Sequence, residues 1–257
     1  MDELFSSALN QSVQRAVSLL KAFDTDASEL GVSELARTVG LPKSTVARLL
    51  ATLEHEGLVE RVPHADKYRL GFLLVRLAGR VSHFGDVRAV ARPVLARLSE
   101  QSQESVHLGV LDGAEVVNVD QIAGPHLIRE TNWLGRRTPL HCAANGKAIL
   151  AFQPEAVIAR VLAAPLARVT PLTMTDPRLV RGELAEVRER GYAWTLGEVE
   201  EGLNGVAAAI RNGAGEVFAA VSVSGPAYRV PPARIPSLGE LVVAAAAEIS
   251  RRLGSRV

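Results

Sequence analysis

A short stretch of the chain gathers side chains that suit nucleic-acid binding. Hydrophobic residues recur at helical spacing between Pro42 and Glu56, and they define the buried side of a predicted helix: Val46, Leu49, Leu50 and Leu53. The N-terminal half of the opposite side carries cations and hydroxyls at Lys43, Ser44, Thr45 and Arg48. Cations and hydroxyls contact DNA phosphates, and arginine also reads guanine in the major groove. The pattern therefore predicts a DNA recognition helix.

The elements around this helix predict a winged helix-turn-helix. Helices are expected over residues 12–23 and 33–39, with Ser12 and Ser33 as N-caps and Gly40 ending the second helix. The turn that follows is short, as a helix-turn-helix requires. Two β-rich runs, residues 58–62 and 67–70, flank a turn at residues 63–66 and form the wing. The wing places three cations against the acid Asp66, and these are expected to reach phosphates or the minor groove: Arg61, Lys67 and Arg69.

The rest of the chain predicts a second, larger domain. Residues 72–84 form a candidate linker helix, and a further helix is expected over residues 87–101. Asp112-Gly113 separates β-rich runs at 106–111 and 115–121, and a similar pair returns at 206–210 and 217–223. Helices are expected from Pro177 to Gly191 and over residues 234–253. Hairpins imply antiparallel pairing, so the expected fold class is α+β, with domains at 10–71 and 86–257 and a linker at 72–85.

Composition narrows the class of protein. The chain has 257 residues, a net charge of +1 and one cysteine, Cys142, which excludes an internal disulfide and fits a reducing compartment. No apolar run approaches the roughly 20 residues of a membrane span, and the acidic start lacks the layout of a secretion signal. We therefore expect a cytoplasmic protein with no membrane partner. Because residues 1–76 are not basic as a whole, DNA binding depends on local charge, and an ordinary solvated helix face is the alternative.

Signatures of catalysis are missing from the sequence. It contains no Gly-x-Ser-x-Gly elbow, no phosphate-binding glycine loop with lysine and no dinucleotide fingerprint. His141 and Cys142 are the only adjacent histidine and thiol, and a single cysteine is most often a buried small hydrophobe. Trp133 and Trp194 are more typical of packing than of ligand stacking. No catalytic residue, cofactor or structural metal is predicted, although a cation at His107 or His141 stays open. An enzyme with a vestigial winged helix and a ligand-free interaction protein are the competing classes.

Several short motifs, taken together and in order, resemble the IclR family of transcriptional regulators. In the first half they occupy residues 11–16, 33–36, 40–46 and 68–71, including Gly-Leu-Pro-Lys-Ser-Thr-Val at 40–46. In the second half they occupy residues 106–108, 139–141, 146–148, 190–192 and 222–226. The resemblance spans residues 12–253. It implies a winged helix joined by a helical linker to a GAF-like antiparallel sheet that binds a small organic effector. It also implies dimers or tetramers, and two-fold pairing predicts a near-palindromic DNA operator.

The same resemblance implies an effector pocket. Its residues would be Ala144 and Asn145 from a loop backbone, Thr195, Leu203 and Gly205 from a glycine-rich stretch, and Ser222 and Ser224 from a central strand. Two hydroxyls with loop N–H groups suit a carboxylate, and the family suggests a small organic or aromatic acid. The family can place an acid at Thr195 and a cysteine at Gly205, so we expect a less acidic and roomier pocket. The recognition helix departs from the family pattern at Ala47, where many members of the family have a larger polar residue.

Overall fold

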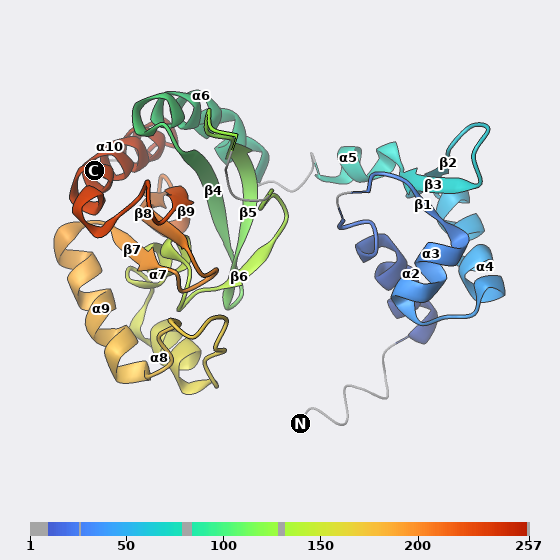
Figure 1. The fold of residues 1–257 in the computed structure, drawn as a ribbon, viewed down its shortest axis with the longest axis horizontal. Helices are drawn as coiled ribbons and strands as arrows, with labels where there is room; N and C mark the ends of the chain where they lie inside the picture. The colour runs from blue at the N-terminus through green and yellow to red at the C-terminus, as the bar shows by residue number, and fades with distance from the viewer. Residues whose placement is uncertain (1–9, 26, 79–83, 128–131, 256–257) are drawn as a thin grey trace. The chain divides into compact units, whose positions relative to one another are not determined.

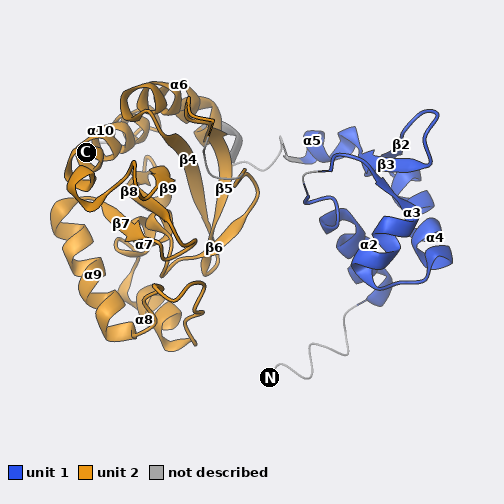
Figure 2. Cartoon of the chain, viewed as in Figure 1, with its two compact units in different colours: residues 1–82 blue, residues 83–257 orange. Residues whose placement is uncertain are grey.

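A computed structural model gives the fold for residues 10–25, 27–78, 84–127 and 132–255 (Figure 1). Within these ranges, no helix combines the length and the apolar composition needed to cross a lipid bilayer. The chain divides into two compact units, residues 1–82 and residues 83–257 (Figure 2). Each unit has a hydrophobic core of its own, and each is described separately.

Unit 1 is a winged helix-turn-helix. Its elements are α2 (Gln11–Lys21), β1 (Leu30–Gly31), α3 (Val32–Val39), α4 (Lys43–His55), β2 (Val59–Arg61), β3 (Lys67–Leu70) and α5 (Phe72–Ala78). The strands form an antiparallel sheet in the order β1-β3-β2. Helices α2, α3 and α4 pack together around a core that includes Leu19, Leu35, Val46 and Leu50. The buried side predicted for α4 is confirmed, with Leu49 only half-buried.

Two predicted helix caps in unit 1 are wrong. The Asn10 side chain caps α2, because its Oδ1 accepts hydrogen bonds from the backbone N–H groups of Ser12 and Val13 at 3.0 and 3.3 Å. Gly31 is the N-cap of α3, and its N–H donates to Glu34 Oε2 at 2.7 Å. The side chains that bind backbone N–H groups at the starts of α2 and α3 are therefore Asn10 and Glu34, and not the predicted Ser12 and Ser33. Gly40 ends α3 in the left-handed conformation, as predicted (φ 67°).

Unit 2 is built on a six-stranded antiparallel sheet. Its first elements are α6 (Phe84–Ser102), β4 (Ser105–Asp112), β5 (Glu115–Ile122), β6 (Arg137–Pro139), α7 (Ala144–Leu150) and α8 (Glu155–Ala163). The remainder are α9 (Pro177–Arg190), β7 (Ala193–Leu196), β8 (Leu203–Arg211), β9 (Val217–Pro226), a short 3-10 turn (Pro232–Arg234) and α10 (Ile235–Arg252). The strand order is β6-β5-β4-β9-β8-β7. Both predicted hairpins are confirmed, whereas β6, β7, α7 and α8 were not predicted.

The predicted linker helix corresponds only in part to the structure. Helix α5 covers Phe72–Ala78, and α6 already begins at Phe84. Phe84 and Gly85, assigned to the linker from the sequence, thus start the first helix of unit 2. The intervening residues 79–83 lie outside the described ranges.

The two faces of the unit 2 sheet have different chemistry. One face packs on α6 and α10 through large aliphatic side chains, such as Leu108, Val221 and Val223. The other face packs on α7, α8 and α9, and its residues near α7 are small or polar, such as Ser222, Ala207 and Ala220. Figure 1 shows α6 and α10 together on one side of the sheet and α9 and α8 toward the other. The second face therefore leaves room beside α7.

A bulge in the sheet assigns two polar residues of β5 to opposite faces. Leu108 pairs with Asp120, but the next residue, Gly109, pairs with Asn118, so β5 contains one extra residue. Asn118 consequently faces α7. Asp120 faces α6, where it is buried and its carboxylate meets Arg92 Nη1 at 2.6 Å and Arg88 Nε at 3.4 Å.

Helix α7 approaches the neighbouring backbone so closely that Gly146 has no space for a side chain. A Cβ at Gly146 would lie 2.5 Å from the Leu140 carbonyl oxygen and 2.6 Å from Leu140 Cα. We therefore expect Gly146→Ala to lower the free energy of unfolding by about 1–3 kcal/mol, as overpacking does. Chemical denaturation measures this change. Gly182→Ala is the matched control, since Gly182 lies within α9 with no atom near its missing Cβ. That substitution should instead stabilise by about 0.5–1 kcal/mol. Equal effects of the two substitutions would contradict the packing of α7.

Candidate functional site

Helix α4 presents the predicted DNA-reading residues on its exposed side. Lys43, Ser44 and Arg48 are exposed and Thr45 is half-buried, while Val46, Leu50 and Leu53 anchor the opposite side in the core. Within the described part of the chain, neither Lys43 nor Arg48 forms an ion pair. These cations are therefore available to an external anion.

The wing is less basic than predicted, because it carries a second acid besides Asp66. This acid is Glu60, which lies directly opposite Arg69 on the paired strands β2 and β3. Arg69 donates to Glu60 Oε2 from Nε at 3.1 Å and from Nη2 at 2.9 Å, and this hydrogen bonding lowers the pKa of the Glu60 carboxyl. Arg61 donates to the Tyr68 hydroxyl at 2.8 Å. Lys67 is exposed and forms no ion pair with any described residue.

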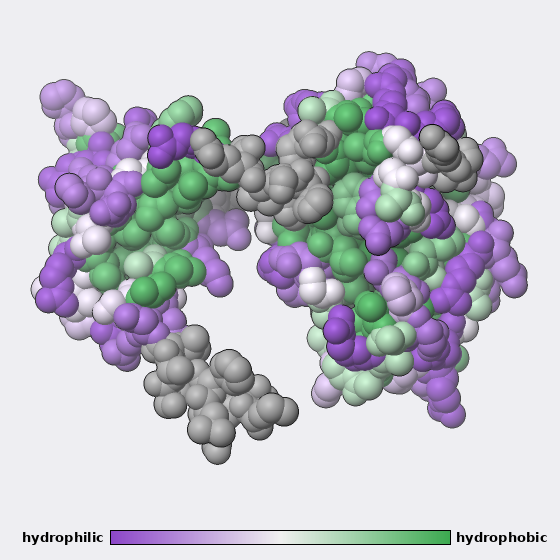
Figure 3. All heavy atoms as spheres, turned by 180° about the vertical axis from the view of Figure 1, so that it is seen from behind, coloured by the Kyte–Doolittle hydropathy of each residue, from purple (hydrophilic) through white to green (hydrophobic). Residues whose placement is uncertain are grey.

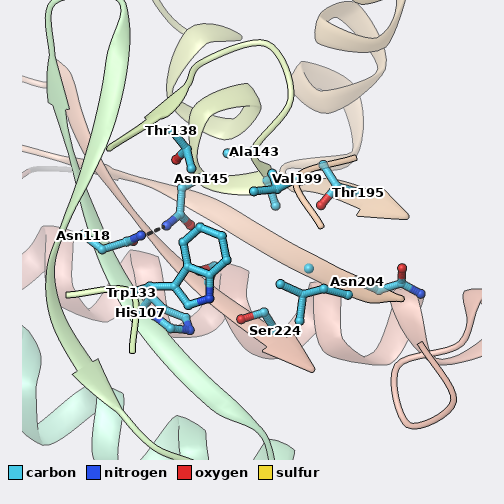
Figure 4. Close-up of a pocket in the computed structure, with 14 residues that line it drawn as sticks. His107, Asn118, Trp133, Thr138, Ala143, Asn145, Thr195, Val199, Asn204 and Ser224 are labelled. Atoms are coloured by element: carbon cyan, nitrogen blue, oxygen red, sulfur yellow. Dashed lines mark hydrogen bonds between the residues drawn. The ribbon is translucent and has the colours of Figure 1, made fainter. Parts of the chain in front are cut away.

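Unit 2 contains a pocket beside α7 that brings together all seven residues assigned to the effector site. About 490 Å³ of space is free of protein atoms there, counting the part open to solvent. The lining comes from the polar face of the sheet, from α7 and from two connecting segments (Figure 4). The predicted residues that line it are Ala144, Asn145, Thr195, Leu203, Gly205, Ser222 and Ser224.

Strand pairing explains why these residues meet. Ser224 on β9 pairs with Gly205 on β8, and Gly205 pairs with Thr195 on β7, so the three lie in one row across the sheet. Ser222 lies two residues along β9 on the same face, opposite His107 on β4. The sheet irregularity in β8 falls at Ile210–Arg211, so Gly205 is not the bulge that an isolated strand glycine often marks.

Gly205 leaves the pocket wider than a larger residue would. A Cβ there would meet Ala144 Cβ and Thr195 Oγ1 at 3.5 Å, which is ordinary contact. The backbone thus tolerates a side chain at this position, and glycine enlarges the cavity.

Seven further lining residues were not assigned to the pocket from the sequence: His107, Asn118, Trp133, Thr138, Ala143, Val199 and Asn204. Trp133, assigned to packing, lies on the pocket wall, whereas Trp194 packs against the core shared with α6 and α10. The strand register points to His107, because it pairs with Ser222. Among the described residues that line the pocket, none is an aspartate, glutamate, lysine or arginine. The described lining therefore offers hydroxyl, amide, indole and imidazole groups but no carboxylate, ammonium or guanidinium group.

A buried ion cluster fixes the position of α7. Lys147 is fully buried, and its Nζ donates to Glu183 Oε2 at 2.8 Å and to Glu198 Oε1 at 2.5 Å. Thr173 Oγ1 donates to the Glu198 carbonyl oxygen at 2.8 Å. Because Glu198 precedes the lining residue Val199, the cluster ties α7 to the segment that forms another wall of the pocket.

The adjacent His141 and Cys142 do not form a catalytic pair. Burial raises the pKa of the Cys142 thiol to about 12, and its Sγ lies 3.7 Å from the Pro139 carbonyl oxygen. His141 Nε2 lies 3.0 Å from the Ala167 carbonyl oxygen, and burial lowers the pKa of this imidazole. A thiol that stays protonated is a poor nucleophile. In the described ranges, no three His, Cys, Asp or Glu side chains are placed to hold a metal ion.

The carboxyl of Glu198 gives unit 2 a characteristic pH dependence. Burial raises the pKa of Glu198 above its ordinary value of 4.5, although Lys147 opposes the shift. A raised pKa favours the folded state when the carboxyl is protonated. The contribution of Glu198 to the free energy of unfolding is therefore present below pH 4.5 and is lost as the pH rises from 4.5 through the raised pKa. Because glutamine does not ionise, we expect the free energy of unfolding of Glu198→Gln to rise relative to that of the native chain over this pH range, as measured by urea denaturation.

Glu248→Gln is the control with the opposite sign. The hydrogen bond from Arg97 lowers the pKa of Glu248, so its contribution is lost only as the pH falls below 4.5. A Glu198→Gln profile that stays parallel to the native one above pH 4.5 would contradict the burial of this carboxyl.

Comparison with known proteins identifies the family of both units. A family model described as the IclR helix-turn-helix domain matches residues 12–63. A second, described as the C-terminal domain of bacterial transcriptional regulator IclR, matches residues 80–251. These models and the relatives that follow are of transcriptional regulators, which favours the regulator over the enzyme alternative.

Relatives and solved structures agree over nearly the whole chain. The HTH-type transcriptional regulator XynR of Escherichia coli K12 is 36% identical over 245 residues, covering 95% of this chain and 97% of XynR. The E. coli transcriptional repressor IclR is 32% identical, and the match covers 95% of this chain and 90% of that repressor.

The crystal structure of an IclR homolog from Microbacterium hydrocarbonoxydans, complexed with 4-hydroxybenzoate, matches with a TM-score of 0.82 at 31% identity, covering 95% of this chain and 99% of that one. Thermotoga maritima IclR matches with a TM-score of 0.78 at 32% identity, with 95% and 98% covered. With its winged helix and its separate pocket-bearing unit, this chain belongs to the IclR family of bacterial DNA-binding transcriptional regulators.

Proposed function

We propose that the chain is a sequence-specific regulator whose affinity for DNA changes when a small organic acid binds beside α7. The observation that carries the proposal is that Lys43 and Arg48 are exposed on the anchored helix α4 and form no ion pair with any described residue. An α-helix fits the major groove of DNA, and an arginine on its exposed side can read a base edge there. Lys43, Ser44 and Thr45 would contact phosphates beside Arg48.

The wing supports DNA binding with fewer available cations than the three predicted from the sequence. Lys67 and Arg61 are the wing cations that carry no carboxylate partner among the described residues. Arg69 already holds Glu60, so a DNA phosphate would have to compete with that carboxylate. We therefore assign the main phosphate contact of the wing to Lys67.

Exposed hydrophobic residues of unit 1 support pairing of two chains. Six side chains on α2, at the end of β3 and on α5 are largely exposed, and Phe72 is the most exposed of them at 73%: Val13, Val17, Leu70, Phe72, Val75 and Leu77. Figure 3 shows a broad hydrophobic area on the visible face of unit 1. Exposed apolar area of this kind commonly marks a contact with another protein. Two paired chains would read a near-palindromic operator, with one recognition helix per half-site.

The pocket of unit 2 would make DNA binding depend on a small acid. Ser222 and Ser224 are two hydroxyls on one strand face, and they suit the carboxylate of a small acid. A ligand changes DNA binding only if it prefers one arrangement of the two units over another, because equal affinity for both shifts nothing. The bound acid would therefore select one spacing of the paired recognition helices.

Arg48→Ala tests base reading by α4. If Arg48 makes a two-pronged contact with a guanine, the variant should lose about 1–3 kcal/mol of operator binding and relax specificity at one base position. Fluorescence anisotropy with operator and scrambled duplexes measures both effects. Lys67→Ala is the control, and it should weaken all duplexes alike and reduce the salt dependence. Unchanged operator affinity of Arg48→Ala would remove this residue from the reading surface.

Ser222→Ala combined with Ser224→Ala tests the pocket. The double variant should lose the thermal stabilisation that small organic acids give the native chain, since both hydroxyl donors are removed. Its operator affinity without acid should be unchanged because unit 1 is intact. Differential scanning fluorimetry and anisotropy on the same samples measure the two quantities. A full thermal shift in the double variant would place the ligand elsewhere.

Phe72→Glu tests the pairing surface. A charge at this exposed position should weaken chain pairing by at least about tenfold, because it would be desolvated in the contact. Sedimentation velocity measures the association. Leu179→Glu is the control, because Leu179 is an exposed leucine (61%) on α9 of unit 2. Pairing that survives Phe72→Glu unchanged would exclude this part of unit 1 from the contact.

A further inference from the structure

A second cavity lies on unit 2, between the N-terminal half of α6 and the connection from β5 to β6. Helix α6 packs across β4 and β5 on the side of the sheet opposite α7 (Figure 1). About 830 Å³ of space is free of protein atoms in this cavity, counting the part open to solvent. Its described lining shares no residue with the pocket beside α7, so the proposed function assigns it no role.

Two arginines lie side by side on the helical wall of this cavity. Arg88 and Arg92 are one turn apart on α6, so their side chains lie on the same face of the helix. Both pair with the carboxylate of Asp120, at 3.4 Å from Arg88 Nε and 2.6 Å from Arg92 Nη1. The Asp120 side chain is 2% exposed, whereas the two arginine side chains are 53% and 54% exposed. A buried carboxylate thus holds two guanidinium groups that stay accessible to solvent.

The lining of the cavity has an excess of positive charge. Two guanidinium groups share one carboxylate, and the other described lining residues are neutral. Among the described residues, the contacts to Asp120 use only Nη1 of Arg92 and Nε of Arg88, so most N–H donors of the two arginines are available. Each guanidinium presents five donors in a planar fork that matches an oxyanion. The arginine pair therefore favours an anionic group in the cavity.

Two amide side chains add further donors. Gln121 Oε1 accepts a hydrogen bond from the Trp133 backbone N–H at 3.0 Å, and Asn132 Oδ1 accepts one from the Leu134 N–H at 3.0 Å. The amide oxygens are therefore occupied, whereas the NH₂ groups of Gln121 and Asn132 bond no described residue. The cavity thus combines N–H donors from four side chains with a carboxylate, Asp120, that is already paired.

The number of donors distinguishes between oxyanions. A carboxylate has two oxygens and one negative charge, whereas a phosphate monoester has three terminal oxygens and a charge of about −1.5 to −2 near neutral pH. Two guanidinium forks and two amide groups are therefore better matched by the phosphate. Ala123 and Leu134 add apolar surface to the lining, which suits the organic part of an ester.

We propose that this cavity binds a small phosphorylated metabolite, whose phosphate monoester group is held by Arg88 and Arg92. Gln121 and Asn132 donate to the same phosphate, and Asp120 keeps the two guanidinium groups in position. The inference goes beyond the proposed function and does not depend on it, because the site shares no residue with α4 or with the pocket beside α7.

Calorimetric titration of the full-length protein at physiological ionic strength tests the site. The probes are three phosphate esters with different organic parts, each with its parent alcohol: glycerol 3-phosphate with glycerol, glucose 6-phosphate with glucose, and phenyl phosphate with phenol. We expect at least one ester to bind about tenfold or more tightly than its alcohol, because the phosphate supplies the charge-assisted hydrogen bonds. The inference is overturned if no ester of the set binds at millimolar concentration, or if none binds more tightly than its alcohol.

Arg88→Gln tests whether the ester binds at the arginine pair. The variant keeps the shorter contact between Arg92 and Asp120, and it should weaken ester binding about tenfold or more. Arg97→Gln is the matched control, because Arg97 lies on the same helix, is 47% exposed and pairs with Glu248 outside the cavity. Both substitutions remove one positive charge. Equal effects on ester affinity would indicate general electrostatic attraction and would overturn the site.

Chemical modification of the native chain locates the ester without any substitution. Phenylglyoxal reacts with accessible arginines, and mass spectrometry of the peptides measures the rate at each position. The bound ester should slow modification of Arg88 and Arg92 and leave that of Arg97 unchanged; absence of this selective protection would contradict the site.

The class of anion is tested with the carboxylates glycerate, gluconate and benzoate. A carboxylate whose affinity falls in Arg88→Gln as much as that of the ester would refute the preference for phosphate. Operator affinity of Arg88→Gln, measured without ester, should equal that of the native chain. Weaker operator binding by this variant, with no ester bound by the native chain, would assign the arginine pair to DNA and overturn the inference.

Discussion

The close approach of α7 to its neighbours is the constraint on which the pocket depends. Gly146 lets the helix lie against the Leu140 backbone, and the buried Lys147 ties it to Glu183 and Glu198. Breaking a buried ion pair by removing one partner leaves an uncompensated charge, which is strongly destabilising. The same short helix supplies Ala144 and Asn145 to the wall of the cavity. The residues that hold α7 in place and the residues that line the pocket are thus consecutive in the chain.

The two units divide charge in a way that matches their tasks. Unit 1 keeps Lys43, Arg48 and Lys67 exposed and without ion pairs in the described ranges, as a surface that meets a polyanion needs. The described lining of the pocket in unit 2 combines hydroxyls, amides, one histidine and one tryptophan with small and aliphatic residues. Lys147 of α7 is paired within the ion cluster, and Asp120 of β5 is paired with two arginines. A small acid would therefore be bound by hydrogen bonds and by shape.

Much of the fold could be predicted because it depends on local patterns. Helix α4 follows from the spacing of its hydrophobic residues, and the two large hairpins follow from alternation and turn residues. Ser222 and Ser224 fall on one face because strands have a period of two. The pairing of Glu60 with Arg69 was also accessible, since the predicted hairpin sets those residues opposite each other.

Other parts of the site depend on long-range packing that no local pattern encodes. The bulge that turns Asn118 and Asp120 to opposite faces arises from pairing between β4 and β5. Burial of Lys147 requires two glutamates that are 36 and 51 residues away. Trp133 follows no strand period, so its place on the pocket wall emerges only when the fold is assembled.

Coupling between the pocket and helix α4 is tested most directly by measuring the operator Kd with and without the acid, and the Kd of the acid with and without the operator. The operator would first be selected from random duplexes by the full-length protein. The acid would be the one that gives the largest thermal shift in a screen of small organic acids. The account predicts that saturating acid changes the operator Kd, and that saturating operator changes the Kd of the acid by the same factor. Two dissociation constants that are each independent of the other ligand would contradict it.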